Sequence, residues 1–327
     1  MDYVSANSMP WLAGAQQRLR AARARGRMPH SLLLLSAPGL GALQFAQWII
    51  AFALCESADE RPCGSCAACQ LLRADSHPDI HRIGLEEKAQ QVKVEQVREL
   101  IEALALKSYR GGYKVGLIED AETLNTHSAN AFLKTLEEPT MSTLLIMIAK
   151  PSHRLPATIA SRCLRLALRA PPPAVAKAWL DANAPPQGSW DAALALAGGA
   201  PLTAMQLDAA SLSALDEEMQ SSLRQLASGS VDISLLAEQW LRGEAELRIH
   251  WLENWITCRV QAAFNDPNLT QSAEPVRLPA ALLKPKIRPL FELLDACRDF
   301  RRLAVTGLNQ QLALEALLVG GRTALAK

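Results

Sequence analysis

Hydrophobic positions in the first half of the chain form short runs that alternate with longer stretches of helical periodicity. The runs predict strands over Ser31–Ser36, Asp79–Ile83, Tyr113–Glu119, Thr143–Ala149 and Cys163–Leu168. Helices are expected between them, near Ala42–Leu54, Val94–Lys107 and Ser128–Glu137. Strands that alternate with helices of this length indicate a parallel α/β sheet that is covered on both faces.

The strand signal ends at the proline run Pro171–Pro173, which predicts a domain boundary. Residues 174–207 read as short helical stretches broken by proline and glycine, and longer helices are expected from about Leu212. The segment Ile287–Leu318 closes the chain in the same way. We therefore expect three domains: an α/β domain over residues 1–169, a small helical domain over 170–208 and an all-α domain over 209–327.

Composition narrows the class of protein. The chain has 327 residues, of which 49% are hydrophobic, and its formal net charge is only +1. These values are typical of a globular protein and argue against broad electrostatic binding to nucleic acid, although a local basic patch remains compatible with them. No apolar stretch has transmembrane or secretion-signal character. We therefore expect a cytoplasmic location, and we expect no membrane partner.

Four of the seven cysteines are grouped with the spacing C-x7-C-x2-C-x2-C: Cys55, Cys63, Cys66 and Cys69. Four thiolates fill the tetrahedral coordination of Zn²⁺ and leave no position for water, so the predicted zinc site is structural. Reduced thiols in a loop and an iron–sulfur cluster are the alternatives. The other three, Cys163, Cys258 and Cys297, are expected to be small buried residues.

Residues 36–43, SAPGLGAL, have the outline of a phosphate-binding loop between a strand and a helix. Compared with the pattern G-x-x-x-x-G-K-[ST], Gly39 and Gly41 lie in the turn, but Ser36 replaces the first glycine. Ala42 stands at the lysine position and Leu43 at the hydroxyl position. Without a cation or a metal ligand, this loop is not expected to bind or hydrolyse ATP. An ordinary strand-turn-helix is the alternative reading.

Two further strand ends bear on the same question. Glu119-Asp120 follows a predicted strand, where P-loop ATPases carry an Asp-Glu pair, so both carboxylates occur here in reversed order. The fourth predicted strand ends in Ile148-Ala149, which offers no polar side chain. We interpret the acidic pair as a remnant or as a polar contact at a strand end.

A set of motifs in a fixed order gives the chain a specific resemblance. They are Pro10-Trp11, PHSLL (29–33), the degenerate loop, Cys55 with CGSCAAC, NAFLKTLEEP (130–139), LPATIASRC (155–163) and LNQQLALEALL (308–318). In this set the chain resembles the clamp-loader subunits of bacterial DNA polymerase III, within the AAA+ ATPase superfamily. The resemblance covers almost the whole chain. It implies an AAA+ α/β module with a zinc-bearing insertion, then a small helical lid and a C-terminal helical collar.

The resemblance also implies the role of a site. Clamp-loader subunits form a ring of five in which ATP lies between neighbours, and a Ser-Arg-Cys motif contributes its arginine to the phosphates of the adjacent subunit. Carried over to this chain, the motif is Ser161, Arg162 and Cys163, with Arg162 as an arginine finger in trans. From the residues alone, Arg162 capping a strand end or pairing with a carboxylate is the alternative.

The implied protein is a non-catalytic subunit that keeps the ring geometry and has no ATPase activity of its own. Its implied partners are the gamma/tau motor subunits and the delta subunit, and indirectly the sliding clamp and primer-template DNA. Trp240, Trp251 and Trp255 are expected in the core of the helical region. The group Arg298, Arg301 and Arg302 is interpreted as a solvated or subunit-facing helix face, and is not assigned to DNA.

Two other functions remain as alternatives. One is an active, ATP-hydrolysing motor subunit of a clamp loader, against which the missing Lys and Ser/Thr argue. The other is a zinc-dependent DNA-binding regulator, which would need a basic helix beside the cysteines. The sequence around the cysteines is mixed in charge and provides no such helix.

Overall fold

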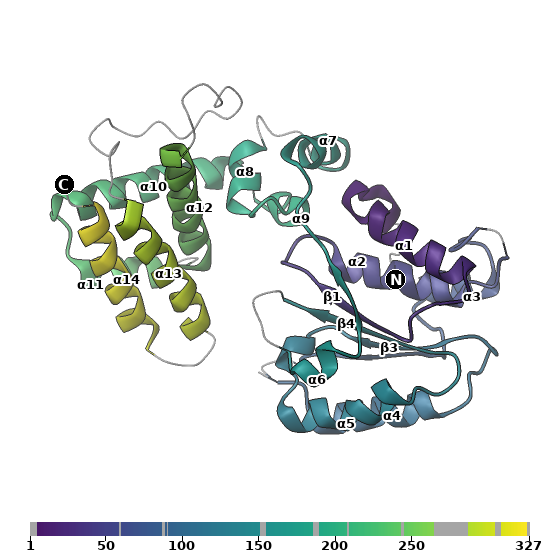
Figure 1. The fold of residues 1–327 in the computed structure, drawn as a ribbon. Coiled ribbons are helices and arrows are strands. Elements are labelled where there is room, and N and C mark those ends of the chain that lie inside the picture. The colour runs from purple at the N-terminus through teal and green to yellow at the C-terminus, as the bar shows by residue number, and fades with distance from the viewer. Residues whose placement is uncertain are drawn as a thin grey trace. The chain divides into compact units, whose positions relative to one another are not determined.

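The computed structural model describes residues 5–58, 60–86, 89, 91–150, 155–185, 190–207, 209–242, 245–264, 287–304 and 309–325. These residues form two compact units (Figure 1). The first comprises residues 1–182 together with 200–203, and the second comprises 183–199 together with 204–327. The expected division into three domains stays a prediction.

A five-stranded sheet organises the first unit, in the order β2-β3-β4-β1-β5. Its strands are β1 (Ser31–Leu35), β2 (Ile80–Ile83), β3 (Lys114–Ile118), β4 (Thr143–Ala149) and β5 (Leu164–Ala167). Every pair of neighbours is parallel. The predicted parallel α/β sheet is thus confirmed, and the predicted strands match within one residue at either end.

Helices cover both faces of this sheet. The helices of the first unit are η1 (Ser5–Ser8), η2 (Pro10–Leu12), α1 (Ala13–Ala24), α2 (Ala42–Leu54), α3 (Ala67–Arg73), α4 (Val94–Ala105), η3 (Ala121–Thr123), α5 (Thr126–Glu137), α6 (Ala157–Ala160), α7 (Pro173–Asn183) and the first three residues of α9 (Pro201–Ala204). In Figure 1, α1 and α2 lie on one face, and α4 and α5 lie on the other. The helices predicted over α2, α4 and α5 are confirmed, whereas α1 and α3 were not expected.

Burial explains why the central strands hold their positions. Leu32, Leu33 and Leu34 of β1 are at most 1% exposed. On one face they meet α2, where the Trp48 ring stacks on Phe52 with 5.1 Å between the ring centroids. A fully buried side chain of this size stabilises the fold by roughly 1.5–3 kcal/mol, so the strand that carries the glycine turn is firmly anchored.

The second unit is helical. Its helices are α8 (Asp191–Leu196), α10 (Ala209–Ser228), α11 (Ile233–Arg242), α12 (Ala245–Phe264), α13 (Ile287–Ala304) and α14 (Gln310–Leu325). Trp240 is 0% exposed, and Trp251 and Trp255 are each 5% exposed, which confirms these residues as core. The Trp251 Nε1–H donates to Asp216 Oδ1 at 3.0 Å and joins α12 to α10.

One expectation needs correction in this unit. The segment Ile287–Leu318 contains α13 and the first part of α14, which continues to Leu325, in agreement with the expected helices. Cys258 is exposed, so the prediction that it is buried was wrong, whereas Cys163 and Cys297 are buried. Cys258 follows Trp251 by seven residues and Trp255 by three, so it shares their helical stripe, and neither residue type nor helical spacing reveals that it is exposed.

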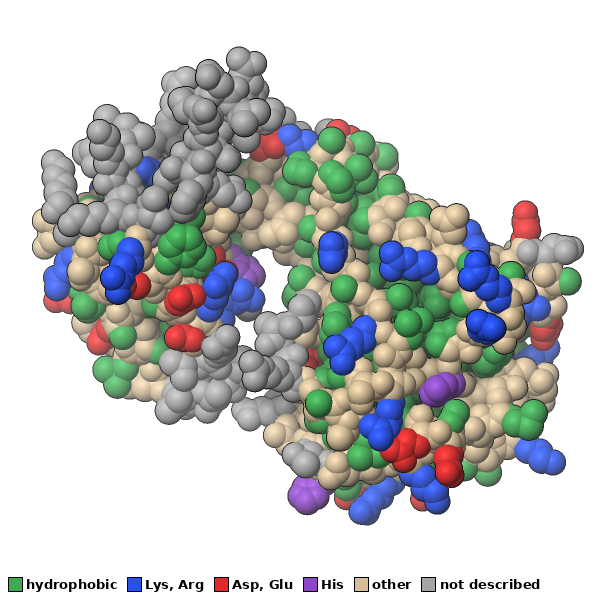
Figure 2. Space-filling view, in the orientation of Figure 1, with side chains coloured by type: hydrophobic (Ala, Val, Ile, Leu, Met, Phe, Trp, Pro, Cys, Tyr) green, Lys and Arg blue, Asp and Glu red, His purple; other side chains and the backbone are tan. Residues whose placement is uncertain are grey.

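The surface carries both signs of charge. On the face drawn in Figure 2, acidic and basic side chains are interspersed with apolar ones over each unit. This distribution agrees with the net charge of +1. None of the described helices has the length and apolar character needed to cross a membrane.

Candidate functional site

The glycine turn joins β1 to α2 as the sequence predicts. Gly39 and Gly41 have φ angles of +75° and +82°, in the left-handed region that glycine adopts without strain. Gly41 caps the N-terminus of α2, and the next two residues are Ala42 and Leu43. Leu43 is 37% exposed, so its apolar side chain lies where a phosphate loop would present a hydroxyl. The framework of the loop is present without its cation and metal ligand.

The chain packs its own residues against this turn. A Cβ added to Gly39 would lie 2.0 Å from Thr203 Oγ1 and 2.7 Å from the Thr203 backbone nitrogen. The backbone N–H of Leu202 donates to the Gly39 carbonyl oxygen at 3.1 Å. The Trp11 Nε1–H donates to the carbonyl oxygen of Leu40 at 2.9 Å. Thus α9 and η2 fix the turn, a feature that sequence analysis missed.

The acidic pair at the end of β3 has a structural role in the described residues. Asp120 Oδ2 accepts the backbone N–H of Leu85 at 3.3 Å, which ties the chain after β2 to the chain after β3. Burial raises the pKa of Glu119, the nearby Asp120 carboxylate adds to this effect, and Arg82 opposes it. The two carboxylates therefore lie at the carboxyl edge of the sheet, as expected.

A third acidic residue at this edge was not foreseen. The Glu122 side chain is only 6% exposed, and its Oε1 lies 3.7 Å from Nζ of Lys150, which follows β4. Since β4 ends at Ala149 as predicted, Lys150 is the first polar side chain beyond it. This edge consequently contains an internal pair of opposite charges. The sequence feature that could have pointed to this pair is Lys150, the charged residue directly after the apolar run of β4.

The Ser-Arg-Cys segment lies between α6 and β5. Ser161 is the C-cap of α6, and the Arg162 backbone carbonyl accepts the hydroxyl of Ser31 at 2.7 Å. Cys163 is buried, and this burial raises the pKa of its thiol. The segment is thereby attached to the start of β1, and Cys163 serves as a core residue beside it.

The Arg162 guanidinium makes contacts within the chain. Its Nε–H donates to Glu137 Oε1 at 2.9 Å, and its Nη2–H donates to the same oxygen. Its Nη1–H groups donate to the carbonyl oxygen of Thr158 at 2.9 Å and to Ser161 Oγ at 3.4 Å. Sequence analysis gave an ion pair between Arg162 and a carboxylate as an alternative, and the structure contains such a pair. The partner, at the end of NAFLKTLEEP, was not identified from the sequence.

Strand register separates Arg162 from the glycine turn. Leu32 on β1 pairs with Leu164 on β5, so Arg162 lies at the level of His30, at the amino edge of the sheet. The turn begins at Ser36, at the carboxyl edge. At about 3.3 Å per residue the two levels are about 20 Å apart, more than an arginine side chain spans. Arg162 therefore cannot reach a phosphate held at its own chain's turn.

The four predicted metal ligands come together after α2. The sulfur atoms of Cys55, Cys63, Cys66 and Cys69 all lie within 4.8 Å of one another, and those of Cys55 and Cys66 are 3.9 Å apart. A tetrahedral zinc ion with bonds of about 2.3 Å separates its sulfurs by about 3.8 Å. The donor set therefore fits Zn²⁺.

Backbone N–H groups point at these sulfurs. Cys63 N–H donates to Cys55 Sγ at 3.4 Å, Cys66 N–H to Cys63 Sγ at 3.4 Å, and Cys69 N–H to Cys66 Sγ at 3.5 Å. Hydrogen bonds from the Ser65 and Cys66 backbone lower the pKa of Cys63 to about 6. Burial raises the pKa of Cys69 to about 12. Donors of this kind stabilise thiolates, the form that binds metal.

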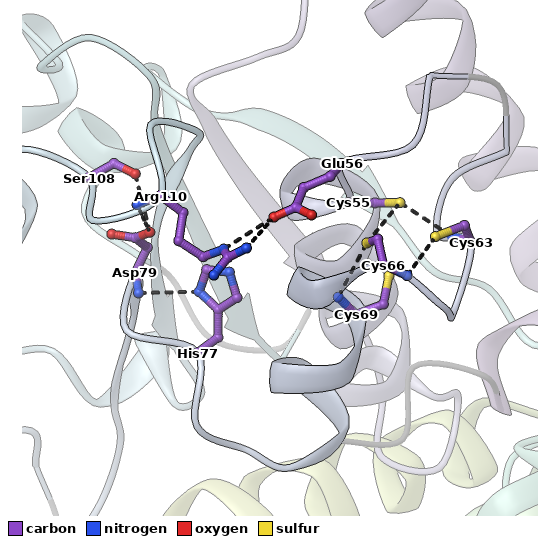
Figure 3. A network of polar contacts seen from close by, with 9 residues as sticks. All are labelled: Cys55, Glu56, Cys63, Cys66, Cys69, His77, Asp79, Ser108 and Arg110. Carbon is purple, nitrogen blue, oxygen red and sulfur yellow. Dashed lines mark hydrogen bonds and ion pairs between the residues drawn. The ribbon is translucent and has the colours of Figure 1, made fainter.

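Side chains connect the cysteine cluster to the sheet (Figure 3). Arg110 donates from Nη2 to Glu56 Oε1 at 2.7 Å, next to Cys55. Asp79, before β2, accepts the backbone N–H groups of Tyr109 at 2.7 Å and Arg110 at 3.2 Å. The cluster is thus fixed to the amino edge of the sheet, which is appropriate for a structural site.

The arginine group of α13 makes local pairs. Arg298 Nη1 lies 3.2 Å from Asp295 Oδ1, and Arg301 Nη1 lies 3.3 Å from Glu253 Oε2. Both side chains remain partly exposed. The Arg302 side chain lies outside the described residues. The two described members thus form a helix face that is balanced by acidic neighbours.

Comparison with known proteins places these features in a family. A family model described as "DNA polymerase III, delta subunit" matches residues 12–172. The curated "DNA polymerase III subunit delta'" of Pseudomonas aeruginosa is 35% identical over 253 residues, which cover 76% of this chain and 76% of that protein. That of Yersinia pestis is 32% identical over 340 residues, 98% of this chain and 97% of that protein.

A second kind of relative matches a shorter part. "DNA polymerase III subunit tau" of Escherichia coli is 34% identical over 146 residues, 44% of this chain and 22% of that protein. The two delta' relatives are more than 30% identical over most of this chain, whereas the tau relative matches less than half of it. The chain therefore belongs to the family of DNA polymerase III delta' subunits.

Proposed function

We propose that this chain is a non-catalytic subunit of the DNA polymerase III clamp loader and lends Arg162 to a nucleotide held by a neighbouring subunit. The observation that carries the proposal is the position of Arg162 at the amino edge of the sheet, opposite the glycine turn. An arginine so placed serves a phosphate only when that phosphate belongs to another molecule. Its planar, permanently charged guanidinium suits phosphate oxygens.

The state of the chain's own turn supports the non-catalytic role. Ala42 and Leu43 supply neither a charge for the phosphates nor a ligand for Mg²⁺. Thr203 and Leu202 also pack against the turn at Gly39. An active motor subunit, the main alternative, would need a cation and a metal ligand at this place. We therefore expect no ATP hydrolysis by this chain alone.

The partners follow from the family and from the resemblance. The family relationship points to the delta' position in a complex with gamma/tau motor subunits and the delta subunit. Through them the chain would help to load the sliding clamp onto primed DNA in the cytoplasm. Residues 1–169 would then form the AAA+ module, 170–208 the lid and 209–327 the collar that holds the ring together.

The four cysteines would hold a structural Zn²⁺. When bound, the ion would cross-link the end of α2 to α3 through Cys55 and Cys69, and it would supply no catalytic chemistry because all four positions are taken by sulfur. Glu56 and Arg110 would pass this rigidity to the sheet. The ion would keep the insertion before β2 in place.

The test is Arg162→Ala in the full chain, reconstituted with its own gamma/tau and delta subunits. Ring assembly should remain intact while the DNA-stimulated ATPase falls by about two-fold or more. Arginine fingers contribute about 10³–10⁵ in rate in GTPases, but other sites in the ring continue to turn over. Arg165→Ala is the matched control, since Arg165 is exposed three residues away. Unchanged ATPase in a correctly assembled Arg162→Ala complex would refute the finger.

A further inference from the structure

The arginine on which the proposed function rests is already engaged in this chain. All three guanidinium nitrogens of Arg162 have acceptors: Glu137 for Nε and Nη2, and Thr158 with Ser161 for Nη1. A phosphate that approaches Arg162 must therefore displace an existing partner. The contact with Glu137 is the only charged one among the described residues.

Glu137 is held in place by its own element. It is the last residue of α5, and the preceding Leu136 is 2% exposed. The ring of His30 donates from Nε2 to the Leu136 carbonyl oxygen at 3.2 Å. His30 precedes β1, and the Ser31 hydroxyl fixes the Arg162 carbonyl. The start of β1 thus positions both members of the pair.

The pair is suited to exchange. The side chains of Arg162 and Glu137 are 35% and 51% exposed, so water and an incoming ligand reach both. Exposed ion pairs contribute little to stability because solvent screens them. A carboxylate oxygen that accepts two guanidinium N–H groups offers the same kind of contact as a phosphate oxygen, with less charge. A nucleotide phosphate is therefore the stronger partner.

We propose that Glu137 is a positioning residue that occupies Arg162 until a nucleotide phosphate of the neighbouring subunit displaces its carboxylate. This inference rests on the proposed function, because it presumes that Arg162 serves a neighbour's nucleotide. While the pair is closed, Arg162 is unable to contact the phosphate. The apparent affinity for nucleotide at that seam is lowered by the fraction of time for which the pair is closed.

The first experiment compares Glu137→Gln with wild type in the reconstituted loader, at varied ATP concentration. Glutamine keeps the shape and removes the charge, so the KM for ATP should fall by about 1.5- to 5-fold, the range expected for losing an exposed ion pair. The kcat should stay the same, because Arg162 still reaches the phosphate. A KM that is unchanged or higher overturns the proposal.

A matched control is available one residue away. Among the residues that the structure describes, none forms an ion pair with Glu138, which is exposed like Glu137. Glu138→Gln removes the same charge and should leave KM unchanged. An equal fall in KM for both variants would indicate a general electrostatic effect and would overturn the specific pair. In an Arg162→Ala background, Glu137→Gln should have no further effect.

A second measurement separates this inference from the proposed function. In the full chain alone, the Nε–H signal of Arg162 in a ¹⁵N NMR spectrum should exchange slowly with water, and Glu137→Gln should accelerate the exchange. If the exchange rate is the same in wild type and in Glu137→Gln, the pair is absent and the inference fails, whether or not Arg162 is an arginine finger. If Arg162→Ala leaves the loader's ATPase unchanged while this signal behaves as expected, the proposed function fails and the pair remains.

Discussion

Leu32 and Leu164 are register partners on the parallel strands β1 and β5, and this one pairing orients the two candidate functional segments. Ser36 and the glycine turn follow β1 at the carboxyl edge of the sheet, whereas Arg162 precedes β5 at the amino edge. Because the two strands are parallel, the segment that follows β1 and the segment that precedes β5 lie at opposite edges of the sheet. The same fold that would hold a nucleotide at one edge thus offers an arginine at the other.

The cysteine cluster makes a prediction about metal content. Denaturing the purified full chain should release about one zinc ion per molecule, because four thiolates complete the coordination. A chelator dye measures the release, and iron assays test for a cluster instead. Cys69→Ser should lower the zinc content, whereas Cys258→Ser should not, since Cys258 is exposed and outside the cluster. Less than a tenth of an equivalent in fresh protein would remove the metal assignment.

The packing at Gly39 predicts unequal effects of alanine at two glycines. Gly39 and Gly111 have φ angles of +75° and +73°, so alanine meets a similar backbone strain of about 1–2 kcal/mol at both. A Cβ at Gly39 would also lie 2.0 Å from Thr203 Oγ1, whereas nothing lies within 4 Å at Gly111. Gly39→Ala should therefore reduce the free energy of unfolding by about 1–3 kcal/mol more than Gly111→Ala, measured by urea denaturation. Equal losses would show that Thr203 does not crowd the turn.

The sheet and the helices α2, α4 and α5 were predictable from local pattern. Strand β4 and helix α2 have the predicted bounds, because each is an almost continuous apolar run that is bounded by polar or turn-forming residues. Helix α3 was missed, since its seven residues lie within a cysteine-rich loop and show no clear period. The cysteine cluster was predictable because its ligands are close in sequence.

Contacts between segments that are distant in the chain were not predictable from the local pattern of the sequence. Thr203 packs on Gly39, and Glu137 pairs with Arg162, through the path of the chain in space. Neither Thr203 nor Glu137 is unusual for a helix, so residue type and spacing carry no signal for these pairings. The motif fixed Arg162 as a candidate residue, but only the fold identified its partner.

A buried histidine predicts how stability depends on pH. His77 is 7% exposed, and its Nδ1 accepts the Asp79 backbone N–H at 3.2 Å, so the ring is neutral in the folded chain. Burial lowers the pKa of His77 below that of an unfolded chain, with Asp79 opposing and Arg110 adding to the shift. The unfolded chain therefore binds the proton first as pH falls below about 6.5, and stability should decrease from there towards the folded pKa.

His77→Asn tests this dependence, because the Asn side-chain oxygen can accept the same N–H and does not titrate. The difference in Tm between wild type and the variant should shift in favour of the variant as pH falls from 8 to 5. His127→Asn is the control, since His127 is exposed. Burial also lowers the pKa of His81, so the variant should keep part of the slope. A Tm difference that does not change with pH would contradict the role of His77.

Restoring the phosphate-loop side chains tests whether the proposed lack of ATP binding at the turn has a single cause. Ala42→Lys with Leu43→Ser rebuilds the missing cation and hydroxyl at positions that are both partly exposed. Thr203 and Leu202 nevertheless remain packed against Gly39, where a Cβ would lie 2.0 Å from Thr203 Oγ1 and where the Gly39 carbonyl oxygen accepts the Leu202 N–H. The double variant should therefore fold normally but show no ATP binding by calorimetry with the full chain. Micromolar binding by the double variant would show that the two side chains were the only obstacle. Binding that appears only when Thr203→Gly is added would assign the obstruction to the Thr203 side chain. The packing of α9 would then be a second reason, independent of Ala42 and Leu43, why the turn does not bind ATP in the proposed function.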